Sequence, residues 1–119
     1  MSIVALTIPA QARHVVLART AGASVAAHAG FTIDRIDDVR LAIDEAVALS
    51  LSYADIDERV GVELELLTSG LEIRIRTATS NVERPSERTF AWMVLATLAD
   101  ELHAELANAV LVLTIRLTP

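Results

Sequence analysis

The sequence predicts an α/β (α+β) fold, a two-layer sandwich in which three helices cover one face of a mainly antiparallel sheet. Three observations support this prediction. Apolar residues recur with helical spacing in three segments, they alternate with a period of two in three others, and a chain of 119 residues that is 53% hydrophobic suits one compact core. We therefore expect a single domain over residues 1–119, with the element order β-α-α-β-β-α-β.

The first half of the chain predicts one strand and two helices. Residues 3–8, IVALTI, form a short β-branched run that stops at Pro9, and Pro can occupy the first position of a helix. A helix over residues 10–29 would end at Gly30, as helices often do. Asp34 can accept the free N–H groups of a second helix, over residues 35–54. At about 100° per residue, the core face of this helix contains Ile36, Val39, Ala42, Ile43, Ala46, Val47 and Ser50.

Two segments in the middle of the chain, VGVELELL and LEIRIRT, predict a β-hairpin. In each of them apolar residues share one face of the strand and charged residues the other. A two-residue turn at Ser69-Gly70 would place Glu65 opposite Arg74 and Glu63 opposite Arg76. Charges and apolar faces would then match across the two strands.

The last part of the chain predicts a loop, a helix and a strand. Residues 77–88, TATSNVERPSER, are mostly polar and form the loop. A helix over residues 89–104 carries Phe90, Trp92, Val94, Leu95 and Leu98, and we expect Trp92 to pack in the core. Residues 108–117, NAVLVLTIRL, close the chain as a strand.

Composition limits the function. The chain has no Cys and every basic residue is Arg, which excludes thiolate metal sites, Cys nucleophiles and a catalytic or phosphate-binding Lys. The net charge of -6 argues against direct nucleic-acid binding, which needs a basic face. No apolar run approaches the roughly 20 residues of a membrane span, and the N-terminus does not read as a signal peptide. We expect a cytoplasmic protein that does not bind membranes.

Several residue clusters suggest other chemistry only weakly. His14, His28 and His103 lack the spacing of a metal site, with no two of them four residues apart, so we expect no metal site. The carboxylates of residues 37–38 and 55–58 could pair as acid and base, but such clusters usually cap helices or lie in solvated turns.

Glu45 raises a specific question, because it lies on the helix face opposite the core. Its neighbours there, at spacings of three, four and seven residues, are Leu41, Ala48, Leu49 and Ser52. A solvent-facing side would carry more charge. We therefore predict that Leu41, Glu45, Ala48 and Leu49 line a shallow cleft or a partner-binding surface, although isolated exposed leucines would also account for the pattern.

The segment LAIDEAVALSLSYA, residues 41–54, resembles the N-box helix of the GHKL (Bergerat-fold, histidine-kinase-like) ATPases, in the branch of anti-sigma factors that are serine protein kinases. The segments ARHVVLARTAGASVAAHAGF, VELELLTSGLEIRIR and FAWMVLATLADEL occur in the order and spacing of that family. The last of these looks closest to the actinobacterial members. The resemblance covers nearly the whole chain and implies the Bergerat fold.

The resemblance also implies roles for single residues. Glu45 matches the family's catalytic base, whereas the magnesium-binding Asn falls on Leu49, which has no oxygen to offer. The adenine-binding D-x-G-x-G motif falls on Thr77, Thr79 and Asn81. A second glycine motif, near the phosphates, falls on Thr89 and Ala91. We interpret Glu45 as the remnant of a catalytic base and the nucleotide site as largely lost, so we expect neither ATP nor magnesium as a cofactor.

The function that follows is binding without catalysis. By resemblance, the protein would be a homodimer that sequesters a sigma factor and is released by an anti-anti-sigma protein. One alternative is an active ATP-dependent serine kinase of an anti-anti-sigma factor, using Glu45. Another is a dimerisation or scaffold module that shares only the fold.

Overall fold

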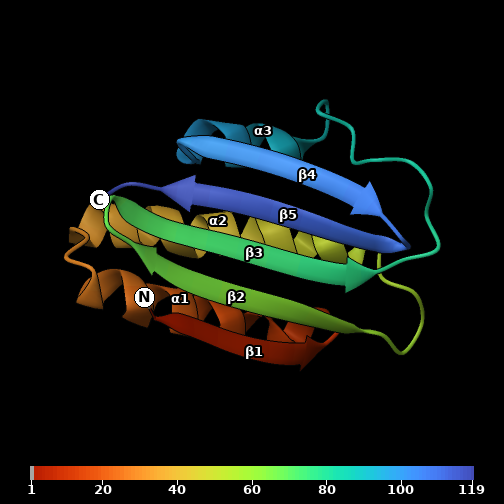
Figure 1. Cartoon of the computed structure of the whole chain (residues 1–119), viewed down its shortest axis with the longest axis horizontal. Helices are drawn as coiled ribbons and strands as arrows, with labels where there is room; N and C mark the ends of the chain where they lie inside the picture. The colour runs from red at the N-terminus through yellow and green to blue at the C-terminus, as the bar shows by residue number, and fades with distance from the viewer. Residues whose placement is uncertain (1) are drawn as a thin grey trace.

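The computed structural model describes residues 2–119 and places three helices on one side of a five-stranded antiparallel sheet (Figure 1). The strands are β1 (Ile3–Pro9), β2 (Arg59–Leu67), β3 (Gly70–Ala78), β4 (Glu101–Ala107) and β5 (Val110–Leu117). The helices are α1 (Val15–His28), α2 (Ile33–Leu51) and α3 (Phe90–Leu98), with a 3-10 turn, η1 (Ala12–His14), before α1. The predicted two-layer α+β class is confirmed.

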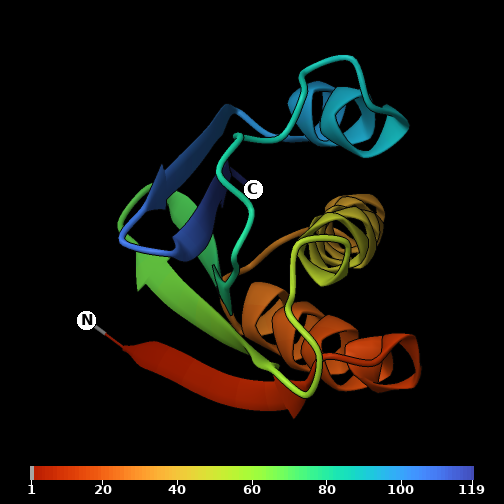
Figure 2. The same cartoon turned by 90° about the vertical axis from the view of Figure 1, so that its right-hand side faces the viewer.

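The sheet order is β1-β2-β3-β5-β4, so β1 and β4 form its two edges. Seen from the end, α1 lies over the β1 side, α2 over the middle and α3 over the β4 side (Figure 2). Helix α2 therefore has a helix on each flank and the sheet beneath it. Among residues 2–119, no helix has the length and apolar character that a membrane span requires.

The core lies between the sheet and the helices. Alternate side chains of the three central strands point into it and are fully buried, namely Val60, Val62, Leu64, Leu71, Ile73, Ile75, Leu111, Leu113, Ile115 and Leu117. The predicted core face of α2 is confirmed from Val39 to Ser50, while Ile36 is half-buried. The Ser50 hydroxyl donates to the carbonyl of Ala46, 2.8 Å away, so its burial leaves no unsatisfied donor.

The outer face of the sheet carries a network of ion pairs. Arg74 contacts Glu63 at 3.3 Å, Glu65 at 3.0 Å and also Glu72. Arg116 contacts Glu72 at 2.8 Å. Hydrogen bonds from Arg116 hold the pKa of Glu72 below its usual value, despite an opposing effect of burial. The charged side chains thus join three adjacent strands on the face that has no helix.

The hairpin register differs from the predicted one. Glu63 lies opposite Arg74, Glu65 lies opposite Glu72, and the turn residues are Thr68 and Ser69. The predicted turn at Ser69-Gly70 is therefore wrong. Gly70 begins β3, where a Cβ atom would collide with the backbone carbonyl oxygen of Leu117. The glycine serves a close approach to β5 and not a turn.

The largest error concerns the end of the third helix, which was expected over residues 89–104. The helix ends at Leu98, and residues 101–107 form the edge strand β4, which pairs with β5. The observed order is thus β-α-α-β-β-α-β-β. Asn108 and Ala109 turn the chain with φ values of 55° and 61°. Turns with these φ values usually contain glycine. Because Ala occupies position 109, the sequence does not indicate a turn there.

Two helix boundaries were also shifted. Helix α1 begins at Val15 instead of residue 10, because residues 12–14 form the 3-10 turn. Helix α2 begins at Ile33, and the hydroxyl of Thr32 accepts the N–H of Arg35, 3.2 Å away. Thr32, not Asp34, is therefore the N-cap. Asp34 lies in the first turn, where its charge still favours the helix dipole.

Candidate functional site

The predicted cleft residues on α2 do not share one environment. Leu41 is 43% exposed, Ala48 is exposed, Glu45 is half-buried and Leu49 is only 7% exposed. Their spacing still places Glu45 between Leu41 and Leu49 around the helix. Solvent exposure along this face therefore falls from Leu41 to Leu49.

Glu45 has no side-chain partner among the residues that the structure describes. Within residues 2–119 its carboxylate forms no side-chain hydrogen bond and no ion pair, whereas the adjacent Asp44 contacts Arg19 at 2.7 Å. A half-buried carboxylate without a partner is available to a group from outside the chain. The structure thus leaves Glu45 open for an interaction.

The positions predicted for the adenine motif lie at and just after the end of β3, and two of the three are buried. Thr77 is buried with its hydroxyl oxygen lacking a hydrogen-bond partner in the described chain. Thr79 is buried as well; its hydroxyl accepts the N–H of Asn81 at 3.0 Å, and its own N–H donates to the carbonyl of Ala109 at 3.0 Å. Asn81 is exposed. The Thr79 contacts fix the start of the following loop to the β4–β5 turn.

The loop between β3 and α3 is tied to the segment after α2. The carboxylate of Asp55 accepts the N–H of Ser80 at 3.1 Å and its hydroxyl at 2.8 Å. Burial, and secondarily the carboxylate of Glu83, raise the pKa of Tyr53. Pro85 is buried in the middle of the loop. The loop therefore contacts the rest of the domain at several points along its length.

The second glycine motif falls on the start of α3. Thr89 caps this helix, with its hydroxyl accepting the N–H of Trp92 at 3.2 Å and donating to the carbonyl of Ser86 at 3.1 Å. Ala91 is half-buried in the first turn. Trp92 packs against the core, as predicted. These residues form the N-cap and the first turn of α3.

The positions where the resemblance predicts a magnesium ligand and glycines carry other groups. Magnesium needs oxygen ligands, and position 49 offers a buried hydrocarbon side chain. None of residues 77, 79, 81, 89 and 91 has the positive φ that glycine would supply. Among the described residues, no group of three or more His, Asp or Glu side chains is placed to hold a metal ion.

An apolar groove lies between α2 and α3. It has a volume of about 330 Å³ and is lined by Leu41, Phe90, Met93, Val94, Thr97 and Leu98. Phe90 is 75% exposed and Met93 58% exposed, which is unusual for side chains of this size. Only Leu41 belongs to the predicted cleft, so the apolar surface is centred on α3. The sequence contained a signal for this surface. The segment FAWMVLATL has no charged residue on any side, so a helix that packs on the core with one side exposes apolar residues on the other.

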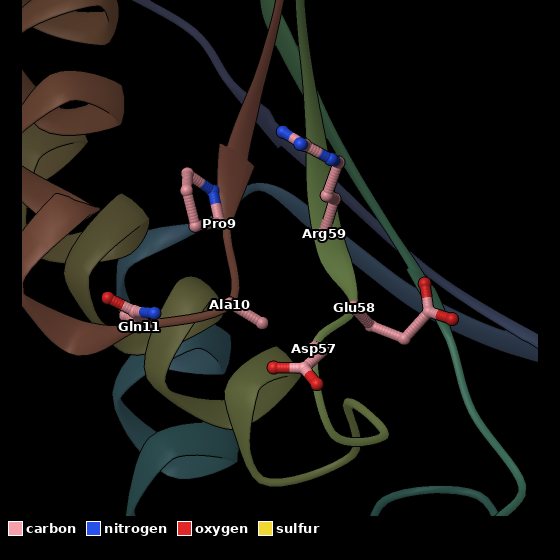
Figure 3. Close-up of a pocket in the computed structure, with 6 residues that line it drawn as sticks. All are labelled: Pro9, Ala10, Gln11, Asp57, Glu58 and Arg59. Atoms are coloured by element: carbon pink, nitrogen blue, oxygen red, sulfur yellow. The ribbon is translucent and has the colours of Figure 1, made fainter.

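A second, polar pocket lies where β1 ends and β2 begins (Figure 3). It has a volume of about 310 Å³ and is lined by Pro9, Ala10, Gln11, Asp57, Glu58 and Arg59. The carboxylates of Asp57 and Glu58 point in different directions, so they do not form the acid and base pair considered above (Figure 3). Asp55, the third member of that cluster, binds Ser80. The pocket does not include Glu45 or any residue of α3.

The three histidines are dispersed. His28 lies 2.7 Å from the carbonyl oxygen of Ser24 through its Nδ1 atom, and His14 lies beside Arg13. His103, expected on a helix, lies in β4 because the third helix ends early.

Comparison with known proteins assigns this fold to a family. Residues 8–117 match the family model described as histidine kinase-like ATPase domain. The chain is 31% identical, over 75 residues, to the serine-protein kinase RsbW of Listeria innocua serovar 6a and to that of Listeria monocytogenes serotype 4a. The aligned part covers 60% of this chain and 48% of each relative, so the chain matches about half the length of those proteins.

Proposed function

Because the chain belongs to the histidine kinase-like ATPase domain family, we propose that it is an anti-sigma-factor-type regulatory protein that works by binding. It sequesters a sigma factor and is released when an anti-anti-sigma protein competes. The proposal includes a largely lost nucleotide site, a cytoplasmic location and a homodimeric state. Similarity to two serine-protein kinases supports this branch of the family.

The observation that carries the proposal is Leu49. Its side chain, on α2, is only 7% exposed, and it occupies the position where the family resemblance expects the ligand of a magnesium ion. Phosphoryl transfer depends mostly on metal and positioned charge. A chain that keeps Glu45 but places a leucine at the metal position retains the scaffold without the means to stabilise the transferred phosphoryl group.

The acidic chain suits a basic partner. A net charge of -6 accelerates encounters with a positively charged helix, while buried apolar groups set the lifetime of the complex. Under this mechanism the competing anti-anti-sigma protein controls release through its concentration or modification state. ATP turnover by this chain plays no part.

The test is calorimetric titration of the purified protein with Mg-ADP and Mg-ATP at low millimolar ligand, followed by capture of sigma factors. We expect no binding heat, no thermal stabilisation by nucleotide, and retention of a sigma factor. The variant Leu49→Asn serves as a comparison, because it restores the oxygen ligand expected by resemblance. Micromolar nucleotide binding by the unmodified chain would overturn the nucleotide part of the proposal.

One observation favours the kinase alternative. The carboxylate of Glu45 is half-buried and has no side-chain partner in the described chain, so it is free to accept a proton from a substrate hydroxyl. Transfer of radiolabelled phosphate from ATP to an anti-anti-sigma protein tests it directly. Label that appears with the unmodified chain and disappears in Glu45→Gln would make this the leading function.

A further inference from the structure

We propose that the apolar groove between α2 and α3 is a docking site for a basic amphipathic helix of a partner protein, with Glu45 pairing a cationic side chain at one end. The assignment rests on the proposed function only in taking that helix to belong to a sigma factor. The groove shares only Leu41 with the predicted surface of Leu41, Glu45, Ala48 and Leu49.

The first step is that the groove is apolar and open. Phe90, Met93 and Leu41 expose large apolar side chains on its walls. Contiguous exposed apolar surface on a folded domain commonly marks an interaction site. Met adapts to different partners because its side chain is unbranched and flexible, which suits Met93 to a surface that must bind and release.

The second step is the size of the groove. Helix α3 runs antiparallel to α2 (Figure 1), and the carbonyl of Leu98 accepts a hydrogen bond from Arg35 at 3.0 Å. From Phe90 to Leu98 the groove is about 12 Å long, at about 1.5 Å per residue. A partner helix with apolar anchors at positions i, i+4 and i+7 spans about 10 Å and fits this length.

The third step is charge. Helix α3 carries no charged residue, so the charge of the groove comes from α2. Asp34, Asp38 and Glu45 stand seven, three and four residues from Leu41, which places their carboxylates on the same side of α2. Asp38 is paired with Arg35 at 3.1 Å, whereas Glu45 has no partner in the described chain. The wall is therefore acidic and attracts a cationic helix.

The fourth step places Glu45 relative to the anchors. Arg35 lies level with Leu98, and Glu45 is about 15 Å further along α2, close to the level of Phe90. A Lys or Arg one turn beyond the last apolar anchor of the partner would meet its carboxylate. A second copy of this chain is disfavoured as the occupant of this groove, because two copies facing each other here would bring their acidic α2 walls together.

The test uses two synthetic 18-residue helical peptides. Both carry Leu at i, i+4 and i+7; one has Lys at the remaining polar positions and its twin has Glu. Nitrogen-15 NMR of the full chain locates binding, and fluorescence anisotropy of labelled peptide measures affinity. We expect the cationic peptide to bind at least tenfold more tightly than its twin, with amide shifts concentrated in α3 and residues 41–45. Equal affinities, or shifts confined to the sheet face, would overturn the proposal.

Paired variants distinguish binding in the groove from general electrostatic attraction between the cationic peptide and the acidic chain. Met93→Glu should weaken binding of the cationic peptide at least tenfold, while Val82→Glu, at an apolar and more exposed position outside the groove, should change affinity less than twofold. Glu45→Gln should reduce the preference for the cationic peptide about fivefold, while Glu105→Gln on β4 should leave it unchanged. Equal losses in Met93→Glu and Val82→Glu would contradict the assignment.

A sigma-factor capture assay distinguishes this inference from the proposed function. Sigma binding that Met93→Glu abolishes supports both. Sigma binding that survives Met93→Glu overturns the groove assignment and leaves the function standing. Peptide binding in the groove without any sigma binding supports the groove and contradicts the function. Light scattering that shows a dimer dissociated by Met93→Glu would instead make a second copy the occupant.

Discussion

Helix α2 packs against two helices, α1 and α3, and the two contacts differ. Against α1 it packs closely: Ala18, Gly22 and Ala26 are buried, and a Cβ atom at Gly22 would collide with the side chain of Ile43. Against α3 the packing is partial. Among the described residues of α3, Leu95 alone is fully buried, while Phe90 and Met93 remain exposed.

The means of attachment differ as well. Small side chains and buried apolar contacts join α1 to α2, with the Arg19–Asp44 ion pair at the surface. The far end of α3 is held by hydrogen bonds from Arg35, which reach the carbonyls of Leu98 and Thr118 at 3.0 Å and 2.8 Å. The α1 flank of α2 is thus a closely packed scaffold. The α3 flank is held by the polar contacts of Arg35, which we call the polar anchor, and leaves an apolar surface exposed.

The α1 flank should give the largest stability effect. Ile43→Ala removes a fully buried side chain from the contact with α1 and should lower the free energy of unfolding by about 2–5 kcal/mol. Urea denaturation measures this change. The control Ile33→Ala, at a largely exposed position of the same helix, should change it by less than about 0.5 kcal/mol. A loss below about 1 kcal/mol in Ile43→Ala would mean that this flank is not the scaffold.

The polar anchor of α3 should give an intermediate effect. Arg35→Met removes hydrogen bonds to two carbonyls and to Asp100, and should cost about 2 kcal/mol, with faster amide exchange concentrated in α3. Hydrogen exchange followed by mass spectrometry locates the change. Arg40→Met breaks only the exposed pair with Asp37 and should cost less than about 1 kcal/mol. Exchange that rises equally in α1 would contradict a local anchor.

The same anchor should depend on pH. Hydrogen bonds from the N–H and hydroxyl of Thr118, and then attraction by Arg35, hold the pKa of Asp100 below its usual value. A carboxylate with a lowered pKa stabilises the folded state above its unfolded pKa, about 3.9, and that contribution is lost as pH falls through the folded value. We expect amide exchange in α3 to rise below about pH 4 relative to α1. Asp100→Asn should remove most of this pH dependence; a profile identical to that of the unmodified chain would assign it to other groups.

The open surface should give the smallest effect on stability. Met93→Gln keeps the length of a 58% exposed side chain and should change the free energy of unfolding by no more than about 0.5 kcal/mol. Thermal denaturation measures it, with Leu95→Gln as the matched change at the buried position of α3. A large loss in Met93→Gln would show that the groove belongs to the core and erase the contrast between the flanks.

The helices and central strands could be predicted because their apolar periodicity is strong. Strand β4 could not, since Leu102, Ala104 and Leu106 continue an apolar helix without an intervening Gly or Pro. The turn that would have revealed it places Ala109 at a φ of 61°, a conformation that Ala seldom adopts. The hairpin register failed for the opposite reason, because Gly70 looked like a turn residue while its role is close contact with β5.

The site could be predicted only in part. Helical spacing placed Leu41, Glu45 and Leu49 on one side of α2, and the structure retains that order. Spacing within one helix does not reveal what lies opposite it. The antiparallel placement of α3 beside Leu41, which creates the groove, depends on contacts between Arg35 and residues more than sixty positions away.

The sheet order has a consequence during synthesis. Strand β4 pairs with β5 across a two-residue turn, so the pair can close within about 1–10 μs of leaving the ribosome. Strand β1 emerges first but pairs with β2, whose first residue, Arg59, follows Pro9 by fifty residues. At about 5–20 residues per second, Ile3, Leu6 and Ile8 wait roughly 3–10 s for their partner strand. The N-terminal edge is therefore the part of the nascent chain that most needs shielding from other chains.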